Sequence, residues 1–257
     1  MRVFLLTLCL GISLFASAHS PLKLTIYTES ALELQKIEKG ELTGFAVELV
    51  RLILANSKLQ GEIQLVPWAR AYKYALNQRN VLLFSTRRTP QREHLFVWAR
   101  PLFPDGFAPW YDSQHFALIC RKKSSLQTSS LAQAKRYVLG VQRSGYSEEF
   151  ARHTLLWPDD KLAPSKNFAD SFFYLQKGKI DLLLTSETEW QTIVRRHQIE
   201  PDLFKVCLDV NFKHSPFYFT FSLDTAQALV EAFNQGFDTL LQQGQYRQLY
   251  QQWDQKH

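Results

Sequence analysis

The chain has 257 residues, of which 46% are hydrophobic and 21% charged, and its formal net charge is +6 at pH 7. This composition supports a folded core and excludes a disordered or fibrous chain, while the length allows one large domain or two smaller ones. Lys and Arg residues are scattered, with a single run at Arg121–Lys123, so we expect no binding to nucleic acid.

The N-terminus has the pattern of a cleaved export signal. Arg2 precedes an uncharged apolar stretch, Val3 to Ala16, and the small residues Ala16-Ser17-Ala18 suit a signal peptidase. Polar residues within the stretch and Pro21 behind it disfavour an uncleaved membrane anchor. We therefore expect a signal peptide over residues 1–18, cleavage after Ala18 and a soluble periplasmic product.

Short strand-like runs alternate with amphipathic helical stretches, which predicts an α/β fold with mostly parallel sheets. The first unit is predicted to contain strands at 22–28, 62–66 and 81–85 and helices at 44–56 and from Pro67. The Pro- and Gly-rich stretch 101–109 then indicates a crossing between domains. The second unit is predicted to contain strands at 116–120, 137–142 and 180–185 and helices at 147–155, 168–177 and from Ser186. The last predicted elements are a strand at 217–221 and helices at 225–242 and 245–253.

Two cysteines remain after the expected cleavage, Cys120 and Cys207. An oxidising compartment permits a disulfide, but the sequence does not show whether the two Cα atoms lie within about 7 Å of each other. A bridge and two buried free thiols therefore both stay open.

The sequence carries no motif typical of a catalytic or metal centre. It lacks a nucleophile elbow, H-E-x-x-H, C-x-x-C and Gly-rich nucleotide loops, and its seven His residues form no i, i+4 pair. We expect no metal, no cofactor and no catalysis. The neighbouring acids Glu148-Glu149 and Asp159-Asp160 point apart on a helix, so solvated faces explain them best.

The third strand of the first unit leads into a segment rich in hydroxyl and arginine side chains. Thr89 and Pro90 predict the cap and first residue of a helical turn, with Arg87, Arg88 and Arg92 beside its free N–H groups. Ligands of open α/β sheets bind beyond the carboxyl ends of strands, and a guanidinium grips a carboxylate with two parallel hydrogen bonds. The segment predicts a carboxylate site with Arg92 as its main candidate, whereas Arg87 and Arg88 fit surface charges equally well.

Four short motifs occur in a fixed order along the chain. They are the helix start within Gly40–Leu49, Thr89-x-x-Arg92, Gly178–Asp181, and Gly244-x-Tyr246 with Trp253. Together they resemble the periplasmic solute-binding proteins of the polar amino-acid uptake type, family 3, over nearly the whole mature chain. Pro67–Arg70 and Arg88–Glu93 also resemble a stand-alone periplasmic subgroup whose ligands are poorly defined.

The resemblance implies a periplasmic-binding-protein-like fold of two α/β lobes joined by two crossing strands. One lobe would comprise residues 19–112 plus 218–257 and the other residues 113–217. Such a protein closes over a small polar solute and delivers it to a membrane permease of an ABC importer. We expect a monomer whose partners are a small-molecule ligand and that permease.

The resemblance also implies which residues contact the ligand. Arg92 takes the ligand carboxylate, and Trp68 forms an aromatic wall or, alternatively, a core anchor. The other expected ligand contacts are Glu29, Arg70, Ser85, Thr89, Arg143, Tyr146, Ser186 and Glu187.

Ser186 departs from the family pattern. Amino-acid binders usually carry Asp at this position to pair with the ligand ammonium, whereas Ser186 with Glu189 fits a helix capping box. We expect Ser186 to act as a cap, so the ligand lacks an α-amino group unless Glu187 or Glu29 replaces the missing acid. Two other functions stay open: a ligand sensor for a membrane receptor, and a dehydratase-like enzyme on the same scaffold.

Overall fold

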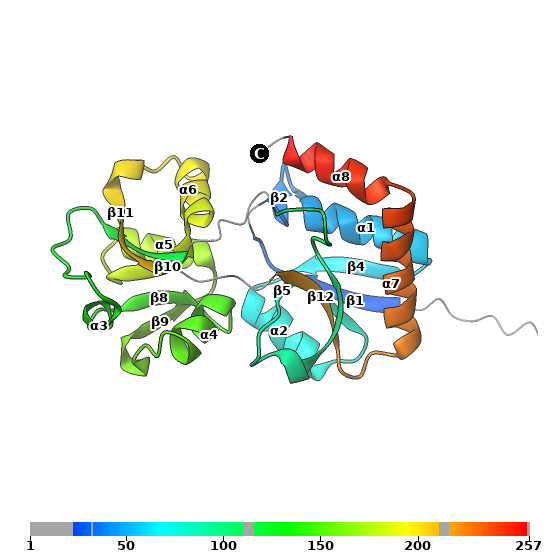
Figure 1. Ribbon diagram of the computed structural model, residues 1–257, viewed down its shortest axis with the longest axis horizontal. Coiled ribbons are helices and arrows are strands. Elements are labelled where there is room, and N and C mark those ends of the chain that lie inside the picture. The colour runs from blue at the N-terminus through cyan, green and yellow to red at the C-terminus, as the bar shows by residue number, and fades with distance from the viewer. Residues whose placement is uncertain (1–22, 32, 110–115, 211–215, 256–257) are drawn as a thin grey trace, which may run out of the picture.

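The computed structural model describes residues 23–31, 33–109, 116–210 and 216–255 (Figure 1). The expected signal peptide and its cleavage after Ala18 lie outside these residues and stay predictions. Among the described residues, no helix combines the length and the apolar character that a membrane crossing requires.

The first lobe is a five-stranded sheet with helices on both faces, on the right of Figure 1. Its strand order is β4 (Gln60–Leu65), β1 (Lys23–Thr28), β5 (Val81–Arg87), β12 (Phe217–Ser222) and β6 (Phe96–Pro101). Its helices are α1 (Phe45–Ser57), α2 (Trp68–Asn77), α7 (Gln227–Gln242) and α8 (Gln245–Asp254), and a small hairpin joins β2 (Lys36–Glu38) to β3 (Glu41–Thr43). Side chains alternate along β5, because Leu82 and Phe84 share a core with α1 and α7 while Val81 and Leu83 share one with α2.

The second lobe is built in the same way. Its strand order is β11 (Phe204–Val210), β7 (Phe116–Arg121), β10 (Leu182–Ser186), β8 (Leu139–Gln142) and β9 (Leu162–Ser165). Its helices are α3 (Leu131–Ala134), α4 (Tyr146–His153), α5 (Phe168–Gln176) and α6 (Glu187–Arg196). Leu182 and Leu184 of β10 face the core under α4, whereas Leu183 faces the core under α5 and α6. The exact lobe boundaries stay predictions, since residues 110–115 and 211–215 lie outside the described part.

The prediction of mostly parallel sheets is wrong. Strands β4, β1 and β5 are parallel, as are β9, β8 and β10, but β12 and β6 in one lobe and β7 and β11 in the other make antiparallel pairs. The chain changes lobes between β6 and β7 and again between β11 and β12. A strand that enters a lobe from the side where the parallel strands end must run against them, which makes β7 and β12 antiparallel.

Residues of the other three motifs, which lie outside the arginine segment, make contacts that stabilise the fold. Gly44, which precedes α1, has φ 124°, and a Cβ atom there would lie 2.4 Å from the carbonyl oxygen of Leu34, so only glycine fits. Glu48 of α1 accepts a 3.1 Å hydrogen bond from Trp253 Nε1, which ties the first helix to the last. The Asp181 carboxylate likewise accepts a 2.9 Å hydrogen bond from the Val138 backbone N–H.

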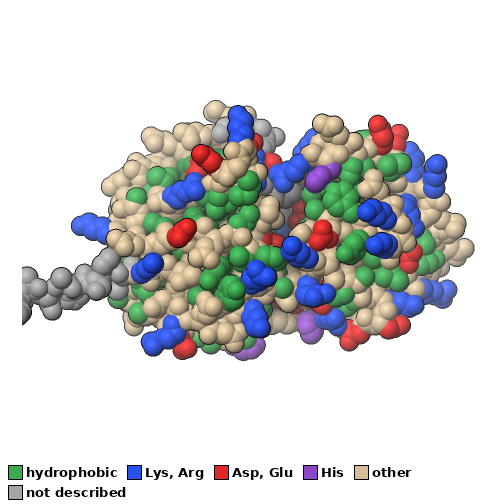
Figure 2. Space-filling view, turned by 180° about the vertical axis from the view of Figure 1, so that it is seen from behind, with side chains coloured by type: hydrophobic (Ala, Val, Ile, Leu, Met, Phe, Trp, Pro, Cys, Tyr) green, Lys and Arg blue, Asp and Glu red, His purple; other side chains and the backbone are tan. Residues whose placement is uncertain are grey.

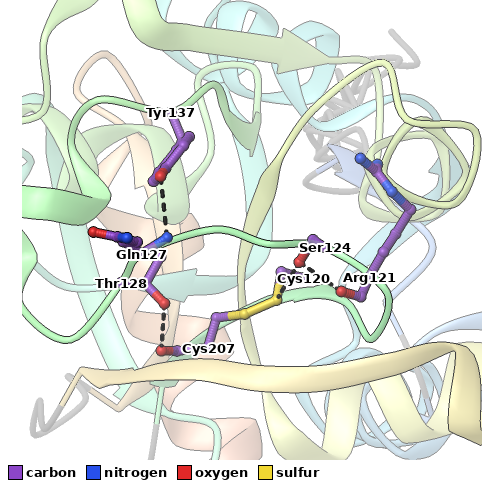
Figure 3. The surroundings of a disulfide bond; sticks show 7 residues. All are labelled: Cys120, Arg121, Ser124, Gln127, Thr128, Tyr137 and Cys207. Atoms are coloured by element: carbon purple, nitrogen blue, oxygen red, sulfur yellow. Dashed lines mark hydrogen bonds between the residues drawn. A yellow bond between two sulfur atoms is a disulfide. The ribbon is translucent and has the colours of Figure 1, made fainter.

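Cys120 and Cys207 form a disulfide, which decides the question that the sequence left open (Figure 3). Their Cα atoms are 5.9 Å apart on the neighbouring strands β7 and β11. The Thr128 hydroxyl donates a 2.8 Å hydrogen bond to the Cys207 carbonyl, so the loop after β7 is fastened beside the bridge. A disulfide agrees with an oxidising compartment.

Candidate functional site

A cavity of about 100 Å³ lies where the two lobes meet. It is bounded by residues at or just after the carboxyl ends of β1, β5 and β8 and at the first turns of α2, α4, α5 and α6, which is where open α/β sheets bind ligands. Figure 2 shows a groove between the lobes, with Lys and Arg side chains on both sides and spread over this face. The lining residues are Glu29, Ala31, Trp68, Ser85, Arg87, Arg92, Phe116, Gln142, Tyr146, Ser147, Phe168, Leu184, Glu189 and Phe217.

A second cavity of about 490 Å³ adjoins the first. The residues that line both are Glu29, Ala31, Gln142, Phe168 and Glu189. Leu65, Val66, Pro67 and Ile193 give the second cavity a more apolar wall. Its size lies within the range of about 300–1,000 Å³ that is typical of small-molecule sites.

Arg92 lines the first cavity and is buried, with 2% of its side chain exposed. It follows β5 in a turn, in which its N–H donates a 3.0 Å hydrogen bond to the Thr89 carbonyl. The guanidinium lies 5.6 Å from the ring centre of Trp68 and 5.3 Å from that of Tyr72, so two aromatic faces stabilise its charge. Its Nε donates a 2.6 Å hydrogen bond to Glu149 of the second lobe.

Glu29 follows β1 and lines both cavities. The pKa of Glu29 is raised to about 8, chiefly by burial and also by the nearby Glu189 carboxylate, although a hydrogen bond from Gln142 and the charge of Arg92 act in the opposite direction. The Gln142 side chain, at the end of β8 in the other lobe, donates that hydrogen bond. A cation placed near Glu29 would favour its ionised form.

Ser85 points toward the cavity because β5 is irregular at this point. Its φ is 60°, in the left-handed region, and the pairing of β5 with β12 shifts register between Tyr218 and Thr220. Such bulges redirect side chains near binding sites. The Ser85 hydroxyl donates a 3.1 Å hydrogen bond to Gln35. Nearby, the guanidinium of Arg87 lies 4.1 Å from the ring centre of Phe217.

Trp68 serves as both an aromatic wall and a core residue, which were alternatives at the sequence level. It is buried in the core under α2 and lines the first cavity. Its Nε1 donates a 2.6 Å hydrogen bond to the Ser144 carbonyl of the second lobe. Tyr146, at the first residue of α4, faces the same cavity from that lobe.

Arg70, Thr89, Arg143 and Ser186 are not among the described residues that line either cavity. Arg70 is exposed on α2, and Arg143 is exposed and donates a 3.4 Å hydrogen bond to the Pro164 carbonyl. Thr89 is buried, but its hydroxyl has no hydrogen-bond partner among the described residues, so it is not the helix cap that the sequence predicts. The predicted helical turn is a short turn followed by a 3₁₀ helix at Glu93–Leu95.

Ser186 is the cap of α6, as predicted. Its hydroxyl accepts a 3.2 Å hydrogen bond from the Glu189 N–H, and the Glu189 carboxylate accepts one from the Ser186 N–H. The Glu187 side chain lies outside the part of the chain that the structure describes.

The prediction of a solvated Glu148-Glu149 face is wrong. Glu149 is 15% exposed and pairs with Arg92, while Glu148 pairs with Arg152 and accepts a 2.6 Å hydrogen bond from the Ser144 N–H. The two acids do point apart, as expected, but one of them points into the contact between the lobes. Gln142 and Glu189 also line the cavity without having been predicted from the sequence. Gln142 ends one predicted second-lobe strand and Glu189 comes four residues after another, and these positions could have indicated them.

No group of His, Cys, Asp or Glu side chains suited to a metal ion occurs among the described residues. The Arg and Glu side chains among the described residues that line the first cavity are Arg87, Arg92, Glu29 and Glu189. Such a site can bind an anionic and a cationic group of one solute by charge-assisted hydrogen bonds.

Comparisons with known proteins agree with this architecture. The sequence profile of bacterial extracellular solute-binding proteins, family 3, matches residues 24–256. Among proteins with curated descriptions, none matches the chain. The two-lobed periplasmic-binding-protein fold implied by the resemblance is confirmed by the solved structures described next.

One similar structure is the arginine-, lysine-, histidine-binding protein ArtJ from Geobacillus stearothermophilus, with 17% identity and a TM-score of 0.71 over 90% of this chain and 94% of that one. An ancestral arginine-binding protein bound to arginine has 20% identity and a TM-score of 0.71 over 91% and 99% of the two chains. A histidine kinase sensor domain with similarity to periplasmic binding proteins has 16% identity and a TM-score of 0.72 over 91% and 96%.

Proposed function

The chain belongs to the bacterial extracellular solute-binding proteins, family 3, and on this premise we propose that it captures a small carboxylate-bearing solute between its lobes for an ABC importer. The observation that carries the proposal is the cavity between the lobes, in which Arg92 lies buried between two aromatic rings. A guanidinium so placed recognises a carboxylate through charge-assisted hydrogen bonds.

A polar amino acid is the solute class that we favour. Its carboxylate would bind Arg92, and its ammonium would bind near Glu29, which takes the place of the acid that the family carries where this chain has Ser186. Glu29 and Glu189 both line the cavity beside Arg92. The similar solved structures include proteins that bind arginine. Trp68, Tyr146 and Ser85 would complete the contacts to the solute.

We further propose that the protein works in the periplasm after removal of residues 1–18, as a monomer that delivers its solute to a membrane permease. The disulfide between Cys120 and Cys207 supports an oxidising compartment. Closure of the lobes around the solute would exclude water and strengthen the charge-assisted contacts. Micromolar affinity would correspond to about 8 kcal/mol of binding free energy.

Native mass spectrometry of the protein, purified without refolding, tests the proposal directly, because a retained solute would give its mass. Titration calorimetry with the twenty common amino acids then measures affinity. Arg92→Ala should lose saturable binding, whereas the control Arg88→Ala should retain it, because Arg88 is exposed and pairs with Glu93. Equal affinities of the wild type and Arg92→Ala would reject Arg92 as the anchor.

A sensor for a membrane receptor is the second candidate, supported by the likeness to a histidine kinase sensor domain. Loss of uptake of an isotopically labelled solute in cells that lack this protein would favour import. A lost transcriptional response with unchanged uptake would favour sensing. The solute should also remain chemically unchanged by NMR during long incubation, since turnover would indicate an enzyme with Glu29 as its acid or base.

A further inference from the structure

Arg92 already holds a carboxylate that belongs to the protein itself. Its Nε donates a 2.6 Å hydrogen bond to Glu149 Oε2, and the two side chains are 2% and 15% exposed. Arg92 belongs to the first lobe and Glu149 to α4 of the second. The pair therefore joins the lobes through a charged contact that water barely reaches.

The groups around the guanidinium leave limited room for a second carboxylate. Trp68 and Tyr72 lie over its charge, Nη2 lies 3.5 Å from the Ser144 carbonyl, and Glu149 takes the Nε edge. Bidentate recognition of a carboxylate by arginine uses two N–H groups on one edge. A solute carboxylate that binds Arg92 through Nε must therefore replace that of Glu149.

We propose that Glu149 is a built-in carboxylate for Arg92, which joins the two lobes while the cleft is empty and is displaced by a carboxylate-bearing solute. The displacement step rests on the proposed function, whereas the joining of the lobes does not. The pair thereby sets specificity. A solute that offers only a carboxylate replaces one carboxylate on Arg92 with another, so it gains little binding free energy. The rest of the solute must therefore supply the net affinity.

Three other contacts between the described parts of the two lobes are weaker candidates for this role. Trp68 donates to the Ser144 carbonyl and Gln142 donates to Glu29, and neither contact is an ion pair. The ion pair of Arg196 with Glu33 is 3.4 Å long, and 36% of the Arg196 side chain is exposed. Exposed pairs contribute little because water and salt screen them. Removing one member of a buried pair leaves an uncompensated charge, and separation of the lobes would rehydrate Arg92.

Small-angle X-ray scattering of the solute-free protein tests the joining of the lobes. Glu149→Gln should increase the radius of gyration, and the charge-reversed variant Arg92→Glu/Glu149→Arg should return it toward the wild-type value. The matched control is Glu93→Gln, which breaks an exposed ion pair within one lobe and should leave the radius unchanged. Circular dichroism verifies that each variant is folded. An unchanged radius of gyration in folded Glu149→Gln would overturn the proposal.

Acetate, a carboxylate with no other binding group, tests the displacement. Saturation-transfer NMR should detect acetate on Glu149→Ala and at least about tenfold less on the wild type, a ratio that corresponds to about 1.4 kcal/mol. The additional change Arg92→Gln should abolish the signal. Equal acetate signals for the wild type and Glu149→Ala would overturn the displacement step, while amino-acid binding measured by calorimetry would still decide the proposed function separately.

Discussion

The charge of Arg92 is compensated by its neighbours before any solute arrives. Glu149 pairs with it, and the rings of Trp68 and Tyr72 lie over it. An isolated buried ion costs several kcal/mol, so an anion site in a cleft needs such support. Tyr72 also keeps its proton more firmly than usual, because burial raises its pKa. Under the proposed function, Arg92 would thus be held in place for an anion, and Glu149 would be the group that a solute has to replace.

Glu29 should make the stability of the protein depend on pH. Burial raises its pKa to about 8 from an ordinary value of 4.5, so the folded protein holds this proton more tightly than the unfolded chain. The contribution of this group to stability is complete below the unfolded pKa and is lost as the pH rises through the folded pKa. Thermal unfolding followed by circular dichroism should therefore show Tm falling as the pH rises from about 4.5 to about 8. Glu29→Gln should remove the part of this fall that the titration of Glu29 causes.

Glu93→Gln provides the control for this measurement. Glu93 is exposed, and its hydrogen bond with Arg88 lowers its pKa, so its removal should leave the fall in Tm between about pH 5 and about pH 8 unchanged. Parallel curves of Tm against pH for the wild type and Glu29→Gln would contradict the prediction, because they would mean that folding leaves the pKa of Glu29 at its ordinary value.

At the scale of elements, the first turns of helices supply both caps and cavity-lining groups. The N-terminus of α6 is closed by the reciprocal contacts of Ser186 and Glu189. Tyr146 and Ser147, which line the cavity, are the first two residues of α4. The irregularity of β5 has a similar consequence, because it directs Ser85 toward the cleft. The cavity-lining groups therefore sit on the ends of rigid elements.

Ser186→Ala distinguishes a cap from a ligand contact. Loss of the cap should lower the free energy of unfolding by about 1 kcal/mol, and solute affinity should not change, because Ser186 does not line either cavity. Urea denaturation and calorimetry measure the two quantities. Ser130→Ala removes the corresponding cap of α3 and serves as the control. A loss of affinity with Ser186→Ala but not with Ser130→Ala would show that Ser186 contacts the solute.

At the scale of the whole molecule, each lobe has its own hydrophobic cores on both faces of its sheet. The contacts between the lobes include polar ones, such as Trp68 with Ser144 and Gln142 with Glu29. Polar interfaces between domains generally permit relative motion. Two stable lobes with a polar contact between them suit a protein that opens and closes around a solute.

The disulfide should stabilise the second lobe and not the first. Cys120→Ala/Cys207→Ala should lower the free energy of unfolding by about 2–5 kcal/mol. Hydrogen exchange should show the loss of protection in β7 and β11, which the bridge joins, while β1 and β5 of the other lobe keep theirs. The wild type under reducing conditions should behave like the variant. An equal loss of protection in both lobes would show that they unfold as one unit.

The sequence by itself determined most elements of the two α/β lobes, because hydrophobic periodicity and turn residues act locally. The strands near Lys23–Thr28 and Leu182–Ser186, and the cap at Ser186, are confirmed. The strands β2, β3, β6, β9 and β11 and the short helix α3 were not predicted. The sequence also could not show which strands are antiparallel, since that depends on where the chain re-enters each lobe.

Only the tertiary structure decided which groups meet in the cleft. The sequence identified Arg92 as the main arginine, but the carboxylate beside it comes from Glu149, 57 positions away and in the other lobe. The tertiary structure also decided that Cys120 pairs with Cys207 and that the irregularity of β5 directs Ser85 toward the cavity. Contacts between distant segments depend on how the two lobes are placed against each other, and no local pattern of residues encodes that placement.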